Sequence, residues 1–273
     1  MSHPRYVVLD KEVGHTPLQT IQAWKELHPE YAHLPASYAG RLDPMASGLL
    51  LVLLGEECKK QEKYHGLDKE YEIEVLLDIG SDTGDVLGIV SPSQTTNVPT
   101  HDIRTVLRNE EGSHMREYPV FSSKTVGGVP LFLHALQGSL DTISIPQHLE
   151  IIYKIRLVSM TTLSTEELRT RVDQMLSTAP KTTEPSKALG ADFRIEAVRT
   201  SWDMALTTPH TYTVIRLQVS CASGSYMRTL AGRIGAALGT HALALSIRRT
   251  RIGRVVQIGS FALWTSTYPR TTH

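Results

Sequence analysis

The sequence predicts an α+β fold built on a mixed, mainly antiparallel sheet flanked by helices. Segments with strand and helix patterns are interspersed without the regular strand–helix–strand spacing of a parallel sheet. Residues 70–76 alternate polar and apolar side chains, which is typical of a half-buried antiparallel strand. Residues 48–54 are one glycine followed by six aliphatic residues, a pattern typical of a strand buried on both faces. A chain of 273 residues is long enough for one large domain or two small ones.

The clearest helix signal lies near the N-terminus. Thr16 is an N-cap residue with Pro17 in the first turn, and Gln19 completes a capping box. The helix should end near residue 28, before Pro29. The other elements expected in this half are a strand at 6–9, a loop over 31–44, a turn at 81–85 that leads to a return strand at 87–90, and a helix at 101–108.

The second half of the chain contains another capping box, from Ser164 to Glu167, whose helix should reach about residue 175. Residues 178–190 are linker-like, and we interpret them as an insertion or a flexible loop because the surrounding region is rich in strands. The remaining elements expected are an extended segment at 118–126 with a turn at 127–128, helices at 131–136 and 225–238, and strands at 151–158, 212–219 and 247–258, the last being the final strand.

The composition excludes several classes of protein. No apolar stretch reaches the length of a membrane-spanning helix, and the start of the chain lacks the basic-then-apolar layout of a signal peptide. Cys58 and Cys221 are the only cysteines, and none of the 12 histidines falls in a metal-binding spacing. We therefore expect a cytoplasmic protein with no metal and no membrane association.

The charged residues are distributed unevenly, although 28 Lys and Arg residues balance 28 Asp and Glu residues. Asp203 is the last acidic residue, and every Lys, Arg, Asp or Glu position after it is an arginine. Such a region can present a positive face even in a neutral molecule, and arginine binds phosphates and stacks on bases. The pattern favours a polyanionic partner over an ordinary solvated surface, which normally mixes both signs.

The most informative segment spans residues 38–55 and holds Asp43 between a glycine-containing loop and a buried strand. Gly40 and Gly48 allow tight turns, and Pro44 fixes the backbone after the carboxylate. A carboxylate at the mouth of an apolar strand is suited to covalent or acid–base chemistry. The alternative is that Asp43 caps the turn through an Asx-type hydrogen bond.

Five separated motifs stand out between residue 11 and about residue 254. They are Lys11-Glu-Val-Gly-His-Thr16; Gly40-Arg-Leu-Asp-Pro-Met-Ala-Ser-Gly48 with Gly55-Glu56; Lys69-Glu-Tyr71 with Ser81-Asp-Thr-Gly-Asp85; Tyr118-Pro-Val-Phe-Ser-Ser-Lys124 with Gly127-Gly128; and Cys221-Ala-Ser-Gly-Ser-Tyr226-Met-Arg228 with Arg248-Arg249-Thr250. Together, and in this order, they resemble the TruB family of pseudouridine synthases, which isomerise a uridine in the TΨC arm of tRNA. The resemblance covers nearly the whole chain.

The resemblance implies catalytic roles for three residues. Asp43 would be the nucleophile, attacking the ribose C1′ or the uracil ring, with Arg228 as its ion-pair partner. Tyr71 would stack on the flipped uracil and is a candidate to move a proton. Read without the family, Arg228 is a candidate phosphate contact and Tyr71 an ordinary strand aromatic.

The resemblance also implies substrate contacts. Tyr226 and Ile247 match positions that line the family's base pocket, although Ile247 suits the core equally well. The candidates for phosphate contacts are Lys124, Arg248, Arg249 and Arg251. A uridine in a folded RNA arm must be rotated out of its stack, and stacking and phosphate contacts would offset the cost.

The chain departs from the family pattern at several positions. Tyr38 stands where the family carries a histidine associated with opening the RNA loop, so we expect Tyr38 to do this by stacking. Arg41 replaces a small residue and creates the Arg-Leu-Asp pattern of the RluA and RsuA families, which keeps an rRNA synthase as the alternative. Only about twenty residues follow Arg254, too few for the PUA domain of many members, so we expect weaker or more salt-sensitive RNA binding.

The resemblance implies a pseudouridine synthase fold with an RNA-binding cleft. We expect one catalytic domain over residues 1–260, an insertion around residues 160–206, a C-terminal tail at 261–273 and no PUA domain. The expected activity is isomerisation of the uridine at tRNA position 55 by a monomer, with the TΨC stem-loop as partner. This reaction breaks a C–N bond and forms a C–C bond, so no cofactor is expected.

Two further alternatives are an RNA-binding or RNA-folding protein with vestigial chemistry and a carboxylate-based glycosidase. The first would be favoured if Asp43 or Arg228 were missing, and both are present. The second requires another acid about 5 to 10 Å from the first. The arginine-only region gives a neutral sugar no reason to bind.

Overall fold

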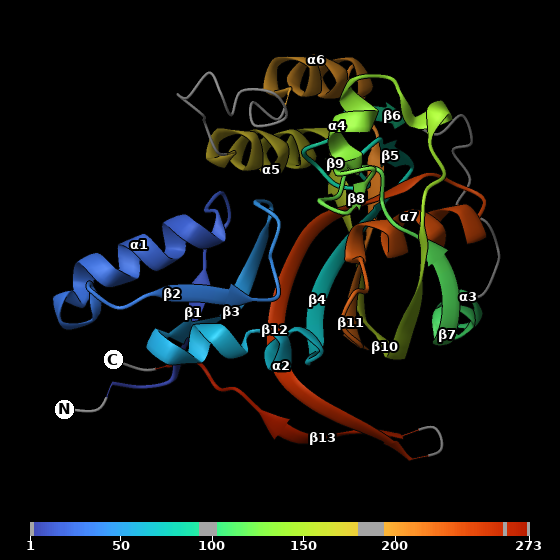
Figure 1. The fold of residues 1–273 in the computed structure, drawn as a ribbon. Coiled ribbons are helices and arrows are strands. Elements are labelled where there is room, and N and C mark those ends of the chain that lie inside the picture. The colour runs from blue at the N-terminus through green and yellow to red at the C-terminus, as the bar shows by residue number, and fades with distance from the viewer. Residues whose placement is uncertain (1–2, 93–102, 180–193, 259–260, 272–273) are drawn as a thin grey trace.

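The computed structural model describes residues 3–92, 103–179, 194–258 and 261–271. Its main sheet consists of β1 (Tyr6–Lys11), β2 (Ala36–Ala39), β3 (Ala46–Leu54), β4 (Asp68–Leu77), β7 (Gly112–Glu117), β10 (Gln147–Ser164), β11 (Thr211–Cys221), β12 (Ala242–Ile258) and β13 (Phe261–Thr267). The strand order is β1-β3-β12-β4-β11-β10-β7, with β2 paired to β3 and β13 to β12 (Figure 1). Within this sheet, the strand pairs of the described residues are antiparallel except β3 with β12. The predicted mixed, mainly antiparallel sheet is confirmed.

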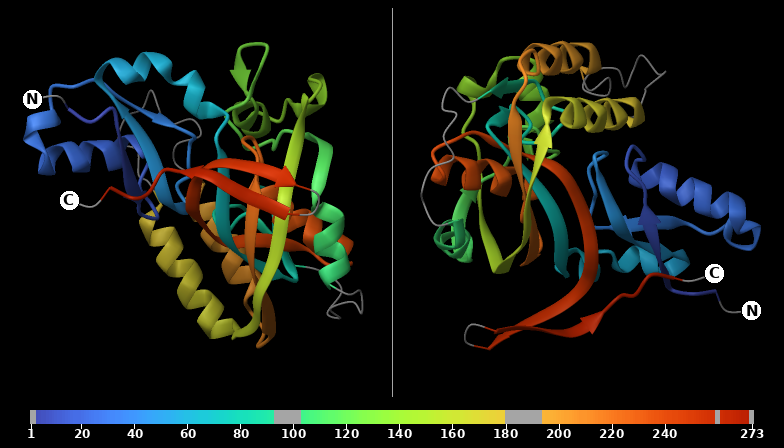
Figure 2. Two further views of the ribbon diagram at one scale, coloured as in Figure 1. Left: turned by 90° about the horizontal axis from the view of Figure 1, so that it is seen from below. Right: turned by 180° about the vertical axis from the view of Figure 1, so that it is seen from behind.

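Seven α-helices in the described residues surround this sheet: α1 (Pro17–Leu27), α2 (Glu62–His65), α3 (Ile103–Glu110), α4 (Leu131–Leu136), α5 (Thr165–Thr178), α6 (Ile195–Ala205) and α7 (Met227–Ala237). Two small hairpins pair β5 (Ile79–Ser81) with β6 (Val90–Pro92) and β8 (Thr125–Val126) with β9 (Val129–Pro130). In Figure 1, α1 lies with β1–β3 on one side, α3 and α7 lie on the other, and α5 and α6 lie together at the top. The long, curved β12 connects these parts, and both chain ends lie close together in every view (Figure 2).

The apolar run of β3 is explained by burial of both its faces. Leu50, Val52 and Leu54 pack with Trp24 of α1 in one cluster. Their neighbours Leu51 and Leu53 pack in a second cluster, which includes Ile252 of β12. A third and larger cluster joins α7 to β4, β11 and β12. Successive side chains of a strand point to opposite faces, so a strand between two clusters has to be apolar throughout.

Both predicted capping boxes are present. The Thr16 hydroxyl accepts a hydrogen bond from Gln19 N, and the Gln19 side chain accepts one from Thr16 N. Ser164 and Glu167 form the same reciprocal pair at the start of α5. The structure assigns the helices to Pro17–Leu27 and Thr165–Thr178, close to the predicted bounds. None of the helices in the described part of the chain is long and apolar enough to cross a bilayer.

The C-terminal region differs from the prediction. β12 begins at Ala242 rather than residue 247, because pairing with β4 imposes a strand on a segment of Ala and Leu that has no β-branched residue. Residues 247–258 do not form the final strand, since β13 follows and pairs with β12. Beyond β13, Thr271 exchanges two hydrogen bonds with Val8 of β1, so the expected tail is tied to the sheet at both ends.

The region around residues 160–206, where an insertion is expected, contains a helix that the sequence did not predict, α6. β10 extends to Ser164, α5 follows, and α6 returns toward β11. The linker-like stretch at 178–190 begins at the last residue of α5, and its residues 180–190 lie outside the described residues. The same holds for residues 101–102 of the helix predicted at 101–108, which the structure describes from Ile103.

Candidate active site

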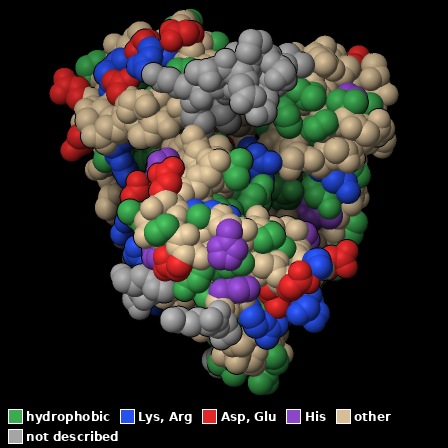
Figure 3. Space-filling model, turned by 60° about the vertical axis from the view of Figure 1, so that its left-hand side comes forward, with side chains coloured by type: hydrophobic (Ala, Val, Ile, Leu, Met, Phe, Trp, Pro, Cys, Tyr) green, Lys and Arg blue, Asp and Glu red, His purple; other side chains and the backbone are tan. Residues whose placement is uncertain are grey.

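A pocket of about 390 Å³ opens beside the loop that precedes β3, at the N-terminal end of α7. Its volume lies in the range of small-molecule sites, about 300 to 1,000 Å³. The space-filling view shows a surface hollowed near its centre, with hydrophobic side chains inside the hollow (Figure 3). The predicted site residues that line the pocket are Asp43, Tyr71, Tyr226, Arg228, Ile247 and Arg249. Further lining residues include Arg41, Lys69, Asp85, Phe121 and Arg194.

The strand register explains why these distant segments meet. The parallel pairing of β3 with β12 sets Ala46, three residues after Asp43, beside Ile247. The antiparallel pairing of β12 with β4 sets Arg249 beside Tyr71. Gly48 makes the parallel pairing possible, because its φ is +100° and a Cβ there would lie 2.2 Å from the carbonyl oxygen of Arg249. The predicted catalytic loop and the predicted arginine segment are thus neighbours in one sheet.

The loop that carries Asp43 is held by backbone contacts. Ala46 N donates to the carbonyl oxygen of Asp43 (3.0 Å), and Gly14 N donates to that of Pro44 (2.9 Å). The buried Lys11 ammonium donates to the carbonyl oxygens of Pro44 (3.3 Å) and Ala46 (2.6 Å). Burial lowers the pKa of Lys11 to about 8, with the nearby Asp43 charge acting in the opposite direction. The sequence placed Lys11 in a motif but assigned it no role.

Arg228 lies in the first turn of α7, and its side chain is almost completely buried. Its Nε lies 2.9 Å from Oδ2 of Asp43. Its two terminal nitrogens donate to backbone oxygens, Nη1 to Thr83 (2.8 Å) and Nη2 to Phe121 (3.0 Å). Burial by itself lowers the pKa of the guanidinium, but the charges of Asp43 and Asp85 raise it more, so the net pKa is raised. Arg228 is therefore a fixed cation that orients one carboxylate oxygen.

Asp85 is a second carboxylate at this arginine, and the sequence did not predict its role. Its Oδ2 lies 3.5 Å from Nε of Arg228. Its Oδ1 accepts hydrogen bonds from the Thr83 hydroxyl (2.9 Å) and from Leu87 N (2.9 Å). Burial raises the pKa of Asp85, and the charge of Arg228 offsets this rise in part. Asp85 ends the motif Ser81-Asp-Thr-Gly-Asp85, and that position was the only signal available in the sequence.

Tyr71 and Arg249 lie side by side on the pocket wall. Burial raises the pKa of Tyr71, while the charge of Arg249 and a hydrogen bond from it act in the opposite direction. Arg249 also donates from Nε to the Leu49 carbonyl oxygen (2.6 Å) and from Nη2 to that of Gly40 (3.0 Å). The side chain is thus buried and engaged with backbone, and the phosphate contact suggested for Arg249 stays a prediction. Arg249 ties the two ends of the Asp43 loop together.

Lys69 is another buried lysine at the pocket. Its ammonium donates to the Ser223 hydroxyl (3.1 Å) and to the carbonyl oxygen of His65 (3.3 Å). Burial, reinforced by the charge of Arg249, lowers the pKa of Lys69 to about 8. Its contacts connect β4 with the turn between β11 and α7, so it helps to place the start of α7. Within the described residues, no three or more His, Cys, Asp or Glu side chains gather as metal ligands would.

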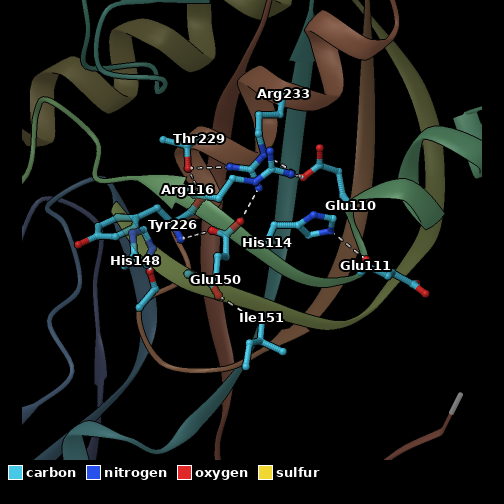
Figure 4. A network of polar contacts seen from close by, with 12 residues as sticks. Glu110, Glu111, His114, Arg116, His148, Glu150, Ile151, Tyr226, Thr229 and Arg233 are labelled. Carbon is cyan, nitrogen blue, oxygen red and sulfur yellow. Dashed lines mark hydrogen bonds and ion pairs between the residues drawn. The ribbon is translucent and has the colours of Figure 1, made fainter. Parts of the chain in front are cut away.

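Tyr226 lies at the pocket edge in a group of aromatic rings. It is the N-cap residue of α7, and its ring packs edge-on against Tyr118 (centroids 6.2 Å apart) and His148 (5.8 Å). Tyr118 and His148 stack on each other at 4.3 Å. The Tyr226 backbone N donates to Glu150, whose other carboxylate oxygen accepts from Arg233 at 2.6 Å (Figure 4). Burial raises the pKa of Tyr226. A partly buried ion pair therefore anchors the backbone of this pocket residue.

Tyr38 and Lys124 do not line the pocket. Tyr38 lies on β2 and packs against the cluster around Trp24. It is therefore part of a side-chain cluster outside the pocket, and the stacking on RNA stays a prediction. Lys124 is exposed, and its ammonium lies 5.0 Å from the centroid of the Tyr118 ring. This position leaves Lys124 near the aromatic group beside the pocket.

Arg248 and Arg251 also lie outside the pocket. Arg248 is exposed and pairs with Asp10 at 2.8 Å. Arg251 lies over the ring of Trp264, 5.1 Å from its centroid, and 3.8 Å from Glu70. Because Glu70 and Tyr71 are adjacent on β4, they point to opposite faces of the sheet, and Arg251 belongs to the face away from the pocket that Tyr71 lines.

Most arginines of the C-terminal quarter, which the sequence suggested could present a positive face, have carboxylate partners in the folded chain. The strands and helices that carry them adjoin β1, β4, α3 and β10, which supply carboxylates. The ion pairs are Arg216 with Glu74, Arg228 with Asp43 and Asp85, Arg233 with Glu110 and Glu150, Arg248 and Arg270 with Asp10, and Arg251 with Glu70. The fold thus places acidic residues from earlier in the sequence beside most of these arginines.

The comparisons with known proteins agree with the motifs. The family model for the TruB family pseudouridylate synthase (N terminal domain) matches residues 32–177. Proteins named tRNA pseudouridine synthase B from Bordetella avium and Azoarcus sp. are 26% and 30% identical to this chain, each over 90% of it. The chain spans 80% of the length of the Bordetella avium protein and 64% of that of the Azoarcus protein.

The fold also has a counterpart among solved structures. A chain in the crystal structure of a Cbf5-Nop10-Gar1 complex aligns with a TM-score of 0.53 and 19% identity, covering 91% of this chain and 48% of that chain. At this identity the likeness shows a shared fold. The family model, in contrast, matches more than half of the sequence and includes the loop that carries Asp43. The chain therefore belongs to the TruB family of pseudouridylate synthases.

Proposed function

We propose that this chain isomerises uridine to pseudouridine in the TΨC arm of tRNA, with Asp43 as the nucleophile. The observation that carries the proposal is the ion pair between the pocket-lining Asp43 and the buried Arg228. Membership of a pseudouridylate synthase family supports the type of reaction. The relatives named tRNA pseudouridine synthase B support tRNA as the substrate.

Asp43 is suited to nucleophilic attack because its carboxylate is both accessible and fixed. The side chain is 40% exposed, while its partner Arg228 is held from behind by two backbone oxygens. A nucleophile that is ionised and oriented before the substrate arrives avoids reorganisation during the reaction. Both the ribose C1′ and the uracil ring are sites of attack open to Asp43.

The isomerisation is balanced without a co-reactant. The C1′–N1 bond breaks, the uracil turns in the pocket, and a C5–C1′ bond forms. C5 loses its proton and N1 gains one, and Asp43 is released unchanged. A tyrosine phenol is neutral at pH 7, and burial raises the pKa of Tyr71 further, so in our proposal Tyr71 stacks on the uracil and donates a hydrogen bond. Tyr226 and Ile247 would bound the base at the other walls.

The proposed RNA partner must contact the surface around the pocket. Phosphate and stacking contacts outside the pocket would offset the energetic cost of flipping the uridine out of its stack. The exposed Arg41 lies at the pocket, and Lys124 is exposed near it. Arg248 and Arg251 would need to contact RNA beyond the pocket. A cytoplasmic monomer that acts without a cofactor, with one catalytic domain over residues 1–260, completes the proposal.

The decisive experiment measures tritium release from tRNA transcripts labelled at uridine C5. Formation of the C5–C1′ bond displaces the C5 hydrogen, so release reports isomerisation directly. We expect release with the wild type and none with Asp43→Asn. Asp203→Asn is the matched control, because Asp203 is an exposed carboxylate paired with Arg169 on the surface. Absence of release by the wild type would contradict the tRNA proposal.

A second candidate substrate is rRNA, and Arg41 is the observation that favours it. Its exposed side chain lines the pocket and completes the Arg-Leu-Asp pattern of the rRNA synthases. Release of tritium from labelled rRNA hairpins, but not from tRNA, would support this alternative. Binding of either RNA without release would indicate a non-catalytic RNA-binding protein.

A further inference from the structure

Arg194 brings the insertion into the catalytic pocket. It immediately precedes α6 and lines the same pocket as Asp43 and Arg228. Its guanidinium lies over the Phe121 ring, with Cζ 4.6 Å from the centroid, and its Nη1 donates to Oδ2 of Asp82 at 2.6 Å. The side chain is only 23% exposed. These contacts connect the insertion to two segments that are distant in sequence.

The same two segments hold the catalytic arginine. Arg228 donates to the backbone oxygens of Thr83 and Phe121. Arg194 contacts the ring of Phe121 and the side chain of Asp82, the neighbour of Thr83. Two arginines therefore bind the same pair of segments, Arg228 through their backbone and Arg194 through their side chains. A shift of either segment would move an acceptor of Arg228.

The helix that follows Arg194 binds the rest of the loop that carries Asp85. Trp202 of α6 is buried and donates from its indole nitrogen to the Val86 carbonyl oxygen (3.0 Å). The Ser201 hydroxyl accepts from Val90 N (3.0 Å). Asp82, which accepts from Arg194, also accepts from Ile89 N through Oδ1 (2.9 Å). The insertion thus braces residues 82–90 at several points along their length.

The backbone of Arg194 is in an unusual conformation. Its φ of 49° and ψ of 36° lie in the left-handed region, and in the described part of the chain Asp78 is the only other non-glycine residue with a positive φ. Such a conformation disfavours side chains with a Cβ and is kept where surrounding contacts hold it, often at functional sites. Here it coincides with the turn that directs Arg194 into the pocket.

We propose that Arg194 is a positioning residue of the catalytic site. It fixes the segments of Thr83 and Phe121 that orient Arg228, and through Arg228 it aims the carboxylate of Asp43. This inference rests on the proposed function of the Asp43–Arg228 pair. The inference assigns the insertion a part in catalysis, whereas an addition confined to the surface would have none.

The first test separates positioning from RNA binding. Single-turnover rates at saturating RNA and Kd values are measured for the wild type, Arg194→Gln and Arg194→Lys. We expect Arg194→Gln to slow the single-turnover rate about tenfold or more, with Kd within about twofold of wild type. Lysine can keep the ion pair with Asp82 but not the flat stack on Phe121, so Arg194→Lys should recover part of the rate. Weaker binding at an unchanged rate would overturn the proposal in favour of a phosphate contact.

The matched control is Arg199→Gln. Arg199 lies on α6 and pairs with Asp173 at 3.0 Å on the exposed side of the helix. The Arg199→Gln substitution should leave both the single-turnover rate and the Kd for RNA unchanged. Phe121→Leu is a second variant that removes the stacking surface while keeping Asp82, and it should slow the rate less than Arg194→Gln. Thermal unfolding of each variant identifies any that lose rate by failing to fold.

A second test does not require turnover. Backbone amide exchange at Leu87 and Ile89 and the NMR signal of the Arg228 Nε–H are compared in wild type and Arg194→Gln. We expect faster exchange and a shifted or broadened Nε–H signal in the variant. Unchanged exchange together with an unchanged signal would overturn the positioning role. If the wild type isomerises neither RNA, the proposed function fails, and this test still decides whether Arg194 positions Arg228.

Discussion

Oδ2 of Asp85 lies 3.5 Å from Nε of Arg228, the same nitrogen that contacts Asp43 at 2.9 Å. One guanidinium nitrogen thus lies between two carboxylates in different environments. Asp43 is 40% exposed, whereas Asp85 is 7% exposed. The carboxylate of Asp43 is open to solvent, whereas that of Asp85 is enclosed. Asp43 therefore shares Nε of Arg228 with a second side chain.

Substitution of Asp85 by asparagine tests this division of roles. The variant removes the carboxyl group that shares Nε of Arg228 with almost no change in shape, so Arg228 should attract Asp43 more strongly and make it a poorer nucleophile. We expect the single-turnover rate to fall about 10- to 100-fold with little change in RNA affinity. Asp141→Asn, at an exposed position, is the control. A wild-type rate for Asp85→Asn would show that the second carboxylate is dispensable.

Tyr71→Phe removes a hydroxyl from the pocket and keeps the ring. If Tyr71 both stacks on the base and takes part in hydrogen bonding, RNA affinity should be kept while the rate falls by about two orders of magnitude. Tyr71→Leu should weaken both affinity and rate, because the ring is lost as well. The comparison uses gel-shift titration and tritium release. Equal losses in the two variants would argue against a role for the hydroxyl.

The buried lysine beneath the Asp43 loop predicts a pH dependence of stability. The pKa of Lys11 is about 8 in the folded protein, against 10.5 for a solvent-exposed lysine, so between these values the unfolded state binds more protons. The free energy of unfolding of the wild type should therefore rise, relative to Lys11→Met, from pH 8 to pH 10.5. Below pH 8 the cost of burying the Lys11 charge is fully present, so the difference in free energy of unfolding between the wild type and Lys11→Met should not change with pH. Urea titrations across this range measure it, and a constant difference would contradict the assignment.

The ion pair beneath Tyr226 predicts a loss of stability on substitution. Glu150 is buried and bonded to both Arg233 and the Tyr226 backbone. Glu150→Gln leaves Arg233 with less compensating charge, although Glu110 still contacts it, and should lower the free energy of unfolding by about 2 kcal/mol. Urea denaturation measures the change. Glu56→Gln, at a fully exposed pair with Lys59, serves as the comparison and should have little effect.

The two cysteines should differ in reactivity. Cys221 is completely buried, and burial raises its pKa to about 12, so little thiolate is present at neutral pH. Cys58 is partly exposed. An ordinary thiol begins to ionise at about pH 8. A thiol reagent at this pH should therefore label Cys58 alone in the native protein and both cysteines after unfolding. Rapid labelling of both native thiols would mean that β11 opens readily beside the pocket.

Much of the local structure could be predicted because its causes are local. The capping boxes at Thr16 and Ser164 depend on residues three positions apart, and both were confirmed. The alternation in β4 is reflected only in part, because Glu72 and Glu74 are partly exposed while the rest of the strand, Glu70 included, is buried. The motifs also placed Asp43, Tyr71 and Arg228 together in one proposed site, and all three line one pocket.

The features that escaped prediction depend on contacts between distant segments. Arg194 enters the pocket only because α6 packs on the loop around Val86, and nothing near residue 194 in the sequence indicates this. Asp85 acquires its partner through the start of α7. Arg249 was a candidate for a phosphate contact, yet its register beside Tyr71 buries it. Contacts between segments far apart in the sequence decided each of these outcomes.

The parallel pairing of β3 with β12 also determines when the site can form during synthesis. β3 emerges early from the ribosome, but β12 begins only at Ala242, so the stretch of β3 that pairs with it, residues 46–48, lacks this partner until most of the chain has been made. Exposed edges of apolar strands invite wrong pairings, and contacts so distant in sequence fold slowly. Asp43 therefore has no completed pocket around it until the C-terminal strands have been translated. A nascent or truncated chain would carry Asp43 but be unable to use it.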